Sequence, residues 1–184
     1  MSDVTEILTA IEQGQAHADK LLPLVYEELR KLAAARMAHE SPGQTLQPTA
    51  LVHEAWLRLV GDANPKFDGR AHFFAAAAEA MRRILIDNAR RKRALRHGGG
   101  QARADVSDID LAAAAKEDEL LAVNDALDKL NAEDKQMADL VKLRFFAGFT
   151  NNEAGRILGM SEPTVERRWA FARAWLFNEI LSSR

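Results

Sequence analysis

The side chains best suited to binding chemistry stand near the C-terminus, between Ser161 and Arg173. Arginine can donate two hydrogen bonds to a guanine edge, threonine can touch a thymine methyl, and glutamate can accept from cytosine. Arg173 lies a turn further along, where a phosphate contact is expected. The candidates for contact with bases are Ser161, Glu162, Pro163, Thr164, Glu166, Arg167 and Arg168. These residue types in one run indicate DNA recognition.

Two short helices are predicted to present these residues. Thr150 and Glu153 have the spacing of a capping box, Gly159 suits a left-handed helix end, and Ser161 can cap the next helix. Helix, tight turn and helix form the DNA-binding helix-turn-helix, whose second helix lies in the major groove. A simple helical hairpin with solvated arginines has the same outline, but the capping pair and the Thr/Arg tip favour DNA binding.

A second set of cations crowds the end of a long predicted helix that ends near His97. Such a density of like charge is costly without a polyanion and gains by releasing counterions from phosphates. Phe67, Phe73 and Phe74 lie just upstream, and bases of single-stranded DNA can stack on such rings. The alternatives are that the rings belong to the core and that the cations form a solvated helix end. The cations are Arg82, Arg83, Arg90, Arg91, Lys92, Arg93 and Arg96, beside one acid, Asp87.

The helix predicted from Leu51 to Val60 has an apolar stripe and a polar face with His53, Glu54 and Arg58. His53-Glu54 begins like a zinc-protease motif, but Leu57 stands where the second histidine is required. The five histidines are scattered, and no phosphate loop or nucleophile–base spacing is present. We therefore expect no catalytic site, no metal and no cofactor.

The composition is that of a globular chain, with 47% hydrophobic and 28% charged residues in 184 and a net charge of -2. The absence of cysteine excludes disulfides and thiolate zinc sites. The N-terminal residues do not form a signal peptide, and no apolar run approaches the ~20 residues that span a bilayer. We expect a cytoplasmic protein that does not contact a membrane.

Strand signals are nearly absent, and helix formers dominate the sequence. The predicted fold is all-α, with two small helical domains joined by an acidic flexible linker and a helix-turn-helix in the second domain. The predicted boundaries are residues 1–97 for the first domain, 98–115 for the linker and 116–184 for the second domain. The glycines at 98–100 and the aspartates at 105, 108 and 110 mark the linker.

Three segments in this order resemble the bacterial sigma factors of RNA polymerase, above all the small extracytoplasmic-function (ECF) type that keeps only the second and fourth sigma domains. The resemblance extends from about Leu21 to Leu181, and the stretch from His72 to Arg93 is similar to a subgroup with an arginine-rich helix and trailing glycines. The segments are TALVHEAWLRLV, FDGRAHFFAAAAEAMRRILIDNARRKRALRHGGG and LVKLRFFAGFTNNEAGRILGMSEPTVERRWAFARAWL.

The resemblance implies roles for matching positions. The helix from Leu51 to Val60 would dock on the clamp helices of the polymerase largest subunit, through Leu51, His53, Glu54, Leu57 and Arg58. The following loop would capture a flipped base of the minus-ten element, through Asn64, Lys66, Phe67 and Asp68. The next helix would read and melt that element, through Arg82, Arg83, Asp87, Asn88, Arg90, Arg91 and Arg93. The helix from Glu162 to Arg173 would read the minus-thirty-five element.

The chain departs from the family pattern at three places. Ala50-Leu51-Val52-His53 stands where many relatives have Asp-Leu-Val-Gln, and Arg83 stands where asparagine is frequent. Ala154-Gly155 replaces the usual Ile-Ala in the first helix of the helix-turn-helix. We expect weaker packing there, because glycine in a helix costs about 1 kcal/mol relative to alanine.

The implied partners are core RNA polymerase and promoter DNA, as a single-stranded minus-ten and a duplex minus-thirty-five element. An anti-sigma factor is common in the broad family, and release by phosphorylation or partner switching is equally open. One alternative function is a stand-alone helix-turn-helix regulator that binds duplex DNA without polymerase. A protein-binding helical adaptor and a hydrolase are further alternatives.

Overall fold

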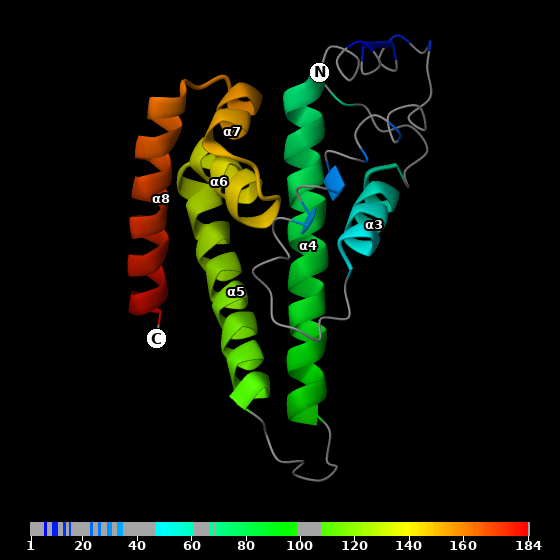
Figure 1. The fold of residues 1–184 in the computed structure, drawn as a ribbon. Helices are drawn as coiled ribbons and strands as arrows, with labels where there is room; N and C mark the ends of the chain where they lie inside the picture. The colour runs from blue at the N-terminus through cyan, green and yellow to red at the C-terminus, as the bar shows by residue number, and fades with distance from the viewer. Residues whose placement is uncertain are drawn as a thin grey trace.

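The computed structural model describes residues 47–60, 67, 69–98 and 108–183, with scattered single positions between 6 and 34. All regular structure in these ranges is helical, which confirms the all-α prediction for this part of the chain (Figure 1). The sequence also predicts helices over residues 3–13 and about 17–39, which lie largely outside the described residues. The elements are α3 (Pro48–Val60), α4 (Gly69–Gly98), α5 (Asp108–Glu133), α6 (Lys135–Val141), the π-helical turn η2 (Lys142–Phe146), α7 (Asn151–Leu158) and α8 (Glu162–Ser182).

Helix α4 is the central element, with α3 on one side and the C-terminal helices on the other (Figure 1). The predicted stripe of α3 is confirmed, since Leu51, Val52 and Ala55 are buried. Helical spacing in the sequence places Phe73, Phe74, Ala77, Met81, Ile84, Leu85 and Asn88 along one side of α4. In the structure α4 packs against α3 and also against α5 and η2. Buried alanines such as Ala77 and Ala78 explain the difference, because small side chains let neighbouring helices approach from both directions.

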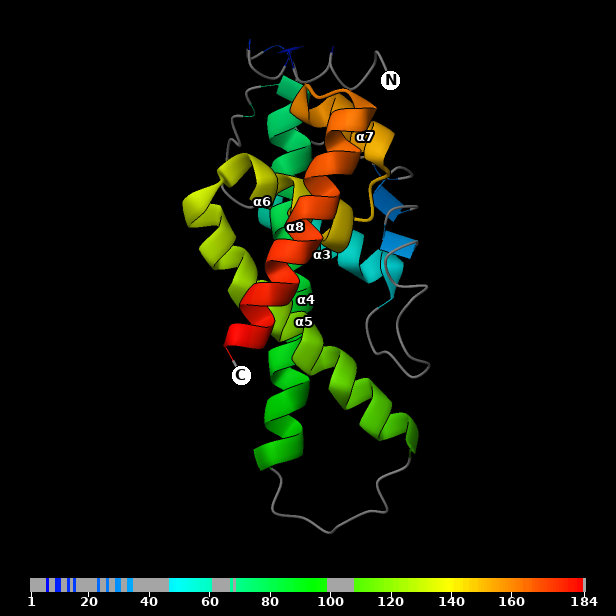
Figure 2. The same ribbon diagram turned by 90° about the vertical axis from the view of Figure 1, so that its left-hand side faces the viewer.

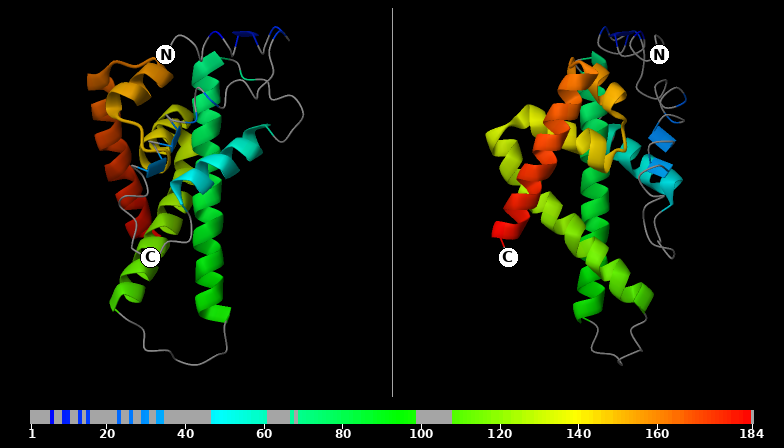
Figure 3. Two further views of the ribbon diagram at one scale, coloured as in Figure 1. Left: turned by 45° about the vertical axis from the view of Figure 1, so that its right-hand side comes forward. Right: turned by 60° about the vertical axis from the view of Figure 1, so that its left-hand side comes forward.

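The C-terminal helices form a layer in which α5 runs obliquely to α4 (Figures 2 and 3). Helical spacing in the sequence predicts an apolar face for α8 at Val165, Trp169, Ala172, Leu176 and Ile180. This is confirmed: Val165, Ala172 and Leu176 are buried, and Trp169 and Ile180 are partly buried against the core. The sequence did not predict η2, a turn in which Ala147 N–H donates to the Lys142 carbonyl at 3.1 Å. A π-helical turn of this kind is formed when an α-helix contains one extra residue, and such turns are frequent at functional sites. Here η2 lies against α4.

The predicted linker over 98–115 differs from the structure in its second half. Helix α4 ends at Gly98, as predicted, but α5 begins at Asp108. The alanine run at 112–115 has the highest helix propensity, and aspartates suit the positive end of a helix. The sequence left open whether the two parts of the chain pack together. In the structure they share one buried cluster, from Leu51 in α3 to Leu176 in α8.

Candidate nucleic-acid interface

Helices α7 and α8 have the local geometry that the sequence predicts. The Thr150 N–H donates to Glu153 Oε2 at 2.8 Å, and the Glu153 N–H donates to Thr150 Oγ1 at 3.3 Å, which forms the capping box. Gly159 ends α7 with φ of 68°, and α8 begins three residues later, at Glu162. The turn therefore holds the start of α8 at a fixed angle to α7.

Gly155 corrects the expectation of weaker packing in α7. A Cβ at this position would lie 2.7 Å from the Met160 carbonyl oxygen and 3.3 Å from Val165 Cγ2. The Met160 N–H donates to the Gly155 carbonyl at 2.9 Å, so the turn closes directly over this residue. The absence of a side chain lets the turn approach α7, and this close approach offsets the low helix propensity of glycine.

The first two turns of α8 leave most predicted base-contacting side chains at the surface. Glu162, Pro163, Glu166 and Arg167 are exposed, as is Ser161 before them. Thr164 is half-buried. The exposed set also includes Arg156 on α7, which the sequence analysis did not single out, and the basic surface therefore extends onto the first helix of the motif.

The polar side chains at this tip differ in their interactions. Ser161 makes no capping hydrogen bond, and its Oγ lies 2.8 Å from Thr164 Oγ1 instead. Asn152 Nδ2 donates to Glu162 Oε2 at 3.3 Å. Among the described residues, no hydrogen bond or ion pair occupies Arg167, so its guanidinium is available to an external acceptor.

Arg168 has a different environment from its neighbour. Its Nη1 donates to Gln136 Oε1 at 2.5 Å, and its Nη2 donates to Asp134 Oδ2 at 3.2 Å. Asp134 also caps α6 by accepting from the Met137 N–H at 2.9 Å. The structure thus gives Arg168 a part in joining α8 to α6, which the prediction of a base contact did not foresee.

Arg173 of α8 lies near a second arginine, Arg144 of η2. Arg173 is exposed, and it lies close enough to Arg144 to act on it electrostatically. Burial, and then the charge of Arg173, lower the pKa of the Arg144 guanidinium. Arg144 also packs over the Trp169 ring at 5.1 Å and donates to the Phe149 carbonyl at 2.6 Å. The sequence analysis missed this side chain, because its contacts join η2 to α8 across 25 residues of chain.

The basic helix α4 turns one predicted DNA contact inward. Arg82 is 8% exposed, and its Nε donates to the buried Asn124 Oδ1 at 3.0 Å. Its Nη2 pairs with Asp128, also on α5, and its Nη1 lies 3.4 Å from Glu79 Oε2. In this arrangement Arg82 contacts α5, and its guanidinium is not open to an external phosphate.

Glu79 is the point where several cations of the two layers meet. It lies 3.0 Å from Arg83 Nε and 3.4 Å from Lys142 Nζ of η2. Burial by itself raises the pKa of Glu79, but the charges of Lys142 and Arg82 and the hydrogen bond from Arg83 outweigh it and lower the pKa. The carboxylate is therefore held ionised by cations from both parts of the chain.

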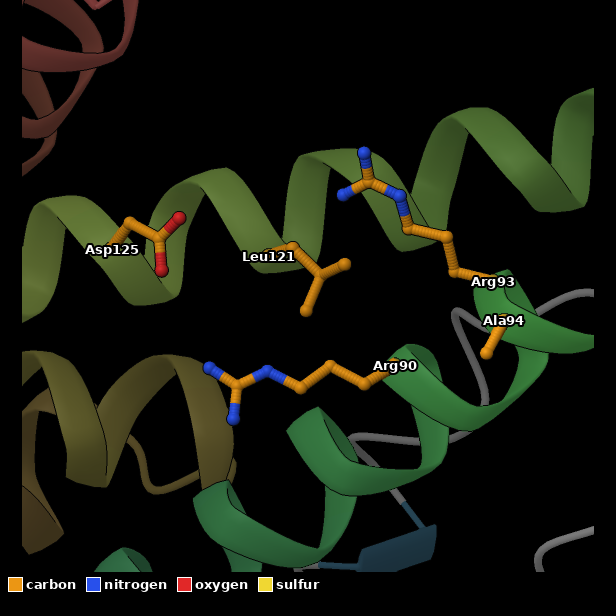
Figure 4. Close-up of a pocket in the computed structure, with 5 residues that line it drawn as sticks. All are labelled: Arg90, Arg93, Ala94, Leu121 and Asp125. Atoms are coloured by element: carbon orange, nitrogen blue, oxygen red, sulfur yellow. The ribbon is translucent and has the colours of Figure 1, made fainter. Parts of the chain in front are cut away.

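The C-terminal end of α4 also faces acids of α5. Lys92 Nζ lies 3.8 Å from Glu117, and Arg93 Nε lies 3.8 Å from Asp118. Between the helices is a crevice of about 490 Å³ (Figure 4). Its lining residues are Arg90, Arg93 and Ala94 from α4, and Leu121 and Asp125 from α5.

The other predicted minus-ten side chains of α4 are more open. Arg83, Arg90 and Arg91 are exposed, and Asn88 is half-buried. Asp87 is exposed and accepts from Arg58 of α3 at 3.3 Å. The side of α4 that bears Arg83 and Arg91 can therefore reach a nucleic acid without any rearrangement.

The aromatic residues near α4 belong to the core in this structure. Phe73 and Phe74 are fully buried, and Phe67 is 6% exposed. Their rings contact one another edge to face, and the Phe74 ring lies 5.5 Å from that of Phe149. The structure thus favours the core alternative for all three rings, and it corrects the prediction that Phe67 contacts a flipped base, because this side chain is buried in the core. The remaining predicted contacts of the loop, Asn64, Lys66 and Asp68, lie outside the described residues.

The outer face of α3 presents most of the predicted polymerase contacts. Leu57 is 69% exposed, and His53 and Arg58 are exposed as well. Arg58 donates to Glu54 Oε1 at 3.0 Å, so the face is ordered by an ion pair. Leu51 is a correction to the prediction: it is completely buried, because it points into the core, and it can only support this face from beneath.

Two further searches concern ions and membranes. Within the described ranges, no three His, Asp or Glu side chains are grouped so that they could hold a metal ion. The described helices also include none with the length and apolar character that crossing a bilayer requires.

Comparison with known proteins yields one match. The family model described as "ECF sigma factor" matches residues 1–182. No curated protein and no solved structure matches the chain. The family match covers nearly the whole sequence, including α3, α4 and the α7–α8 motif.

Proposed function

The chain belongs to the ECF sigma factor family, whose members bind RNA polymerase and direct it to promoters, and on that premise we propose how its surfaces divide this work. Helix α8 reads the duplex minus-thirty-five element, α4 reads and melts the minus-ten element, and α3 docks on core polymerase. The protein makes no covalent bond itself and acts in the cytoplasm, where polymerase transcribes. Its arginine-rich α4, which ends at Gly98, supports membership of the subgroup with trailing glycines.

The observation that carries the proposal is the open tip of α8. Arg167 is exposed beside Thr164 and Glu166, at the end of a helix whose angle is fixed by the turn at Gly159. A rigid helix that presents a guanidinium without an internal partner is suited to bidentate contact with guanine in a major groove. Arg156 on α7 and Arg173 on α8 flank the tip and can contact phosphates.

On α4, the exposed Arg83, Arg90 and Arg91 supply the positive surface for a single strand. Unpairing and unstacking the minus-ten bases costs free energy, which contacts to the strand backbone and to the flipped base offset. The flipped-base contacts of Asn64, Lys66 and Asp68, together with Asn88 on α4, complete this part of the proposal.

On α3, the exposed Leu57 is the apolar centre of the polymerase-docking face. An exposed leucine surrounded by His53, Glu54 and Arg58 has the mixed character of a protein interface, with an apolar contact and a polar rim. The ion pair between Glu54 and Arg58, which continues to Asp87, orders the rim before binding. An anti-sigma factor is a further expected partner, since such factors are common in the family.

Run-off transcription with purified core polymerase tests the proposal, on a promoter taken from upstream of this protein's own gene. We expect transcripts only when the protein and core polymerase are both present, and their loss in Arg167→Ala. The matched control is Lys129→Ala, which removes one cation that pairs with Glu179 at the far end of α8. If the protein shifts duplex DNA tightly by itself and never engages core polymerase, a stand-alone regulator replaces the proposed function.

A further inference from the structure

The two helices that cross at the centre of the molecule carry opposite charge. Helix α4 has eight basic and two acidic side chains, a formal charge of +6. Helix α5 has eight acidic and two basic side chains, a formal charge of −6. The whole chain has a net charge of only -2, so the positive charge of α4 is balanced by the negative charge of α5. Each helix is therefore an electrostatic partner for the other.

Specific contacts join these charges along the crossing. The paired acids extend over positions 117–128 of α5, about 16 Å of helix, which equals the length of about five phosphates on one DNA strand. Arg82 is held most firmly, because its Nε donates to the buried Asn124 while its two Nη groups contact Glu79 and Asp128. The pairs are Arg82 with Asp128, Lys92 with Glu117, and Arg93 with Asp118.

The packed arrangement cannot be the arrangement on a promoter. Elements named minus ten and minus thirty-five are about 25 base pairs apart, which is about 85 Å of B-DNA. Helix α4, the longest element, has 30 residues and is therefore about 45 Å long. Since α8 packs in the layer beside α4, the two DNA-reading helices must separate to reach both elements.

We infer that α5 is an internal competitor of DNA: its acids occupy Arg82, Lys92 and Arg93 in the free protein, and release of α5 exposes these cations for the minus-ten strand. The inference rests on the proposed function, because it takes α4 as the minus-ten surface. It adds that the acidic helix of the second domain controls access to the basic helix of the first. We call the three ion pairs of Arg82, Lys92 and Arg93 with the acids of α5 the latch, and Arg82 lies at its centre.

The latch has the properties of a reversible contact. Arg93 and Asp118 are both largely exposed, and exposed ion pairs contribute little free energy each, whereas in the other pair Arg82 is buried and only Asp128 is largely exposed. Strands of phosphate can compete with them, and polymerase can separate the domains by binding both. Apolar packing reinforces the closed arrangement across the same boundary, since α4 and the C-terminal helices share the buried cluster that includes Phe74 and Phe149, and Lys142 pairs with Glu79.

The first experiment measures the separation of the two layers in the full-length protein. The chain has no cysteine, so spin labels attach only at Ala71→Cys on α4 and Ala174→Cys on α8, both exposed alanines. We expect a short, narrow distance distribution by pulsed electron resonance. Asp118→Lys with Asp128→Lys should shift the distribution to longer, broader values, because it places cations against Arg93 and Arg82.

A matched control reverses two acids of α5 that have no ion pair among the described residues, Glu119→Lys and Glu133→Lys. It changes the net charge equally and should leave the distance short. Adding Arg93→Glu to Asp118→Lys should restore the short distance that Asp118→Lys alone lengthens, because the pair is then re-formed with the charges exchanged. Equal distances in the latch and control variants, or no restoration by the exchange, would overturn the latch.

The second experiment measures binding of a fluorescent oligothymidine of about twenty nucleotides by anisotropy at low salt. The latch variant, Asp118→Lys with Asp128→Lys, should bind about tenfold more tightly than the control variant of the same net charge, Glu119→Lys with Glu133→Lys. The reason is that a larger fraction of the latch variant has α5 released from α4. Equal affinities would overturn the shielding of α4.

The two results also separate this inference from the proposed function. If the labels report opening but the open protein neither binds the oligonucleotide more tightly nor supports transcription with core polymerase, α4 is not the minus-ten surface and the proposed function fails. If transcription depends on Arg167 but the label distance does not respond to Asp128→Lys, the proposed function stands and the latch fails.

Discussion

The protein has two arginine-rich surfaces, one at the tip of α8 and one on α4. They differ in whether a central arginine is already bound to other side chains of the protein. At the tip of α8, Arg167 has no partner among the described residues, and its helix follows directly on the turn at Gly159. On α4, Arg82 is buried and bound to Asn124, Asp128 and Glu79. The same residue type is thus open to an external acceptor at one place and packed internally at the other.

This difference follows from what each arginine meets nearby. The turn between α7 and α8 is built from contacts between residues three to ten positions apart, such as Thr150 with Glu153, and no acid among the described residues pairs with Arg167 at its outer face. Helix α4 meets a helix whose acids lie 46 positions away in sequence, at Asp128. A basic helix is open to nucleic acid only when no such internal partner reaches it.

The largest expected effect comes from Phe74, where both regions share one core. Phe74 is fully buried between Phe73 of α4 and Phe149 before α7. Phe74→Ala should destabilise the protein by about 3–5 kcal/mol, as deletion of a buried phenyl ring does. Urea denaturation followed by circular dichroism measures this loss, and Phe171→Ala, at an exposed ring of α8, should be nearly neutral. Two separate unfolding transitions in the wild type would show that the regions do not share a core.

The sequence predicted those features that depend on neighbours in the chain. The capping box at Thr150, the left-handed Gly159 and the apolar face of α8 were all recognisable because their partners lie within one or two helical turns. The end of α4 at Gly98 was predicted for the same reason. These local signals were enough to predict the capped turn between α7 and α8, and the family that the sequence resembles is the one whose model matches the chain.

The sequence could not predict which side chains α4 contacts on the side that faces α5 and η2. No local pattern indicates that Arg82 meets Asn124, or that Phe74 meets Phe149, since these contacts depend on how α5 and η2 pack. Gly155 was misjudged for a related reason: its value lies in the closeness of the Met160 carbonyl, not in its own helix propensity. Leu51 was assigned to a surface by family resemblance, although its position in the apolar stripe of α3 places it in the core.

Gly155→Ala sharpens the comparison by testing the rigidity of the α8 tip. At an unconstrained helix position this change stabilises by about 0.4–1 kcal/mol. Here the new Cβ would meet the Met160 carbonyl oxygen at 2.7 Å, so we expect a loss of about 1–3 kcal/mol instead. Urea denaturation gives the sign, and binding to duplex promoter DNA should weaken in parallel. A stabilised variant would show that the turn can move away from α7 without cost.

Arg167 and Arg168 allow the comparison to be repeated within a single helix. Arg168→Ala should reduce stability by about 1 kcal/mol, because it removes the hydrogen bonds to Asp134 and Gln136. Arg167→Ala should change stability by no more than about 0.5 kcal/mol and act on duplex binding instead. Chemical denaturation and a duplex-binding assay on the same samples separate the two effects. Equal loss of stability in both variants would contradict the assignment of Arg168 to packing.

The smallest effect is a dependence of stability on pH at Glu79, on the closed side of the comparison. Its pKa in the folded protein is below the ordinary value of 4.5, since the cations around it outweigh the effect of burial. The lowered pKa stabilises the fold fully above about pH 4.5, and the contribution is lost as the pH falls through the folded pKa. Glu79→Gln removes this titration. The free energy of unfolding of the wild type should therefore exceed that of Glu79→Gln at neutral pH, and the difference should shrink below pH 4.5.

Glu119→Gln, at an exposed acid of α5, should follow the wild type throughout. A difference that stays constant with pH would mean that Glu79 contributes through packing, and that its charge does not hold Arg82 and Lys142 together.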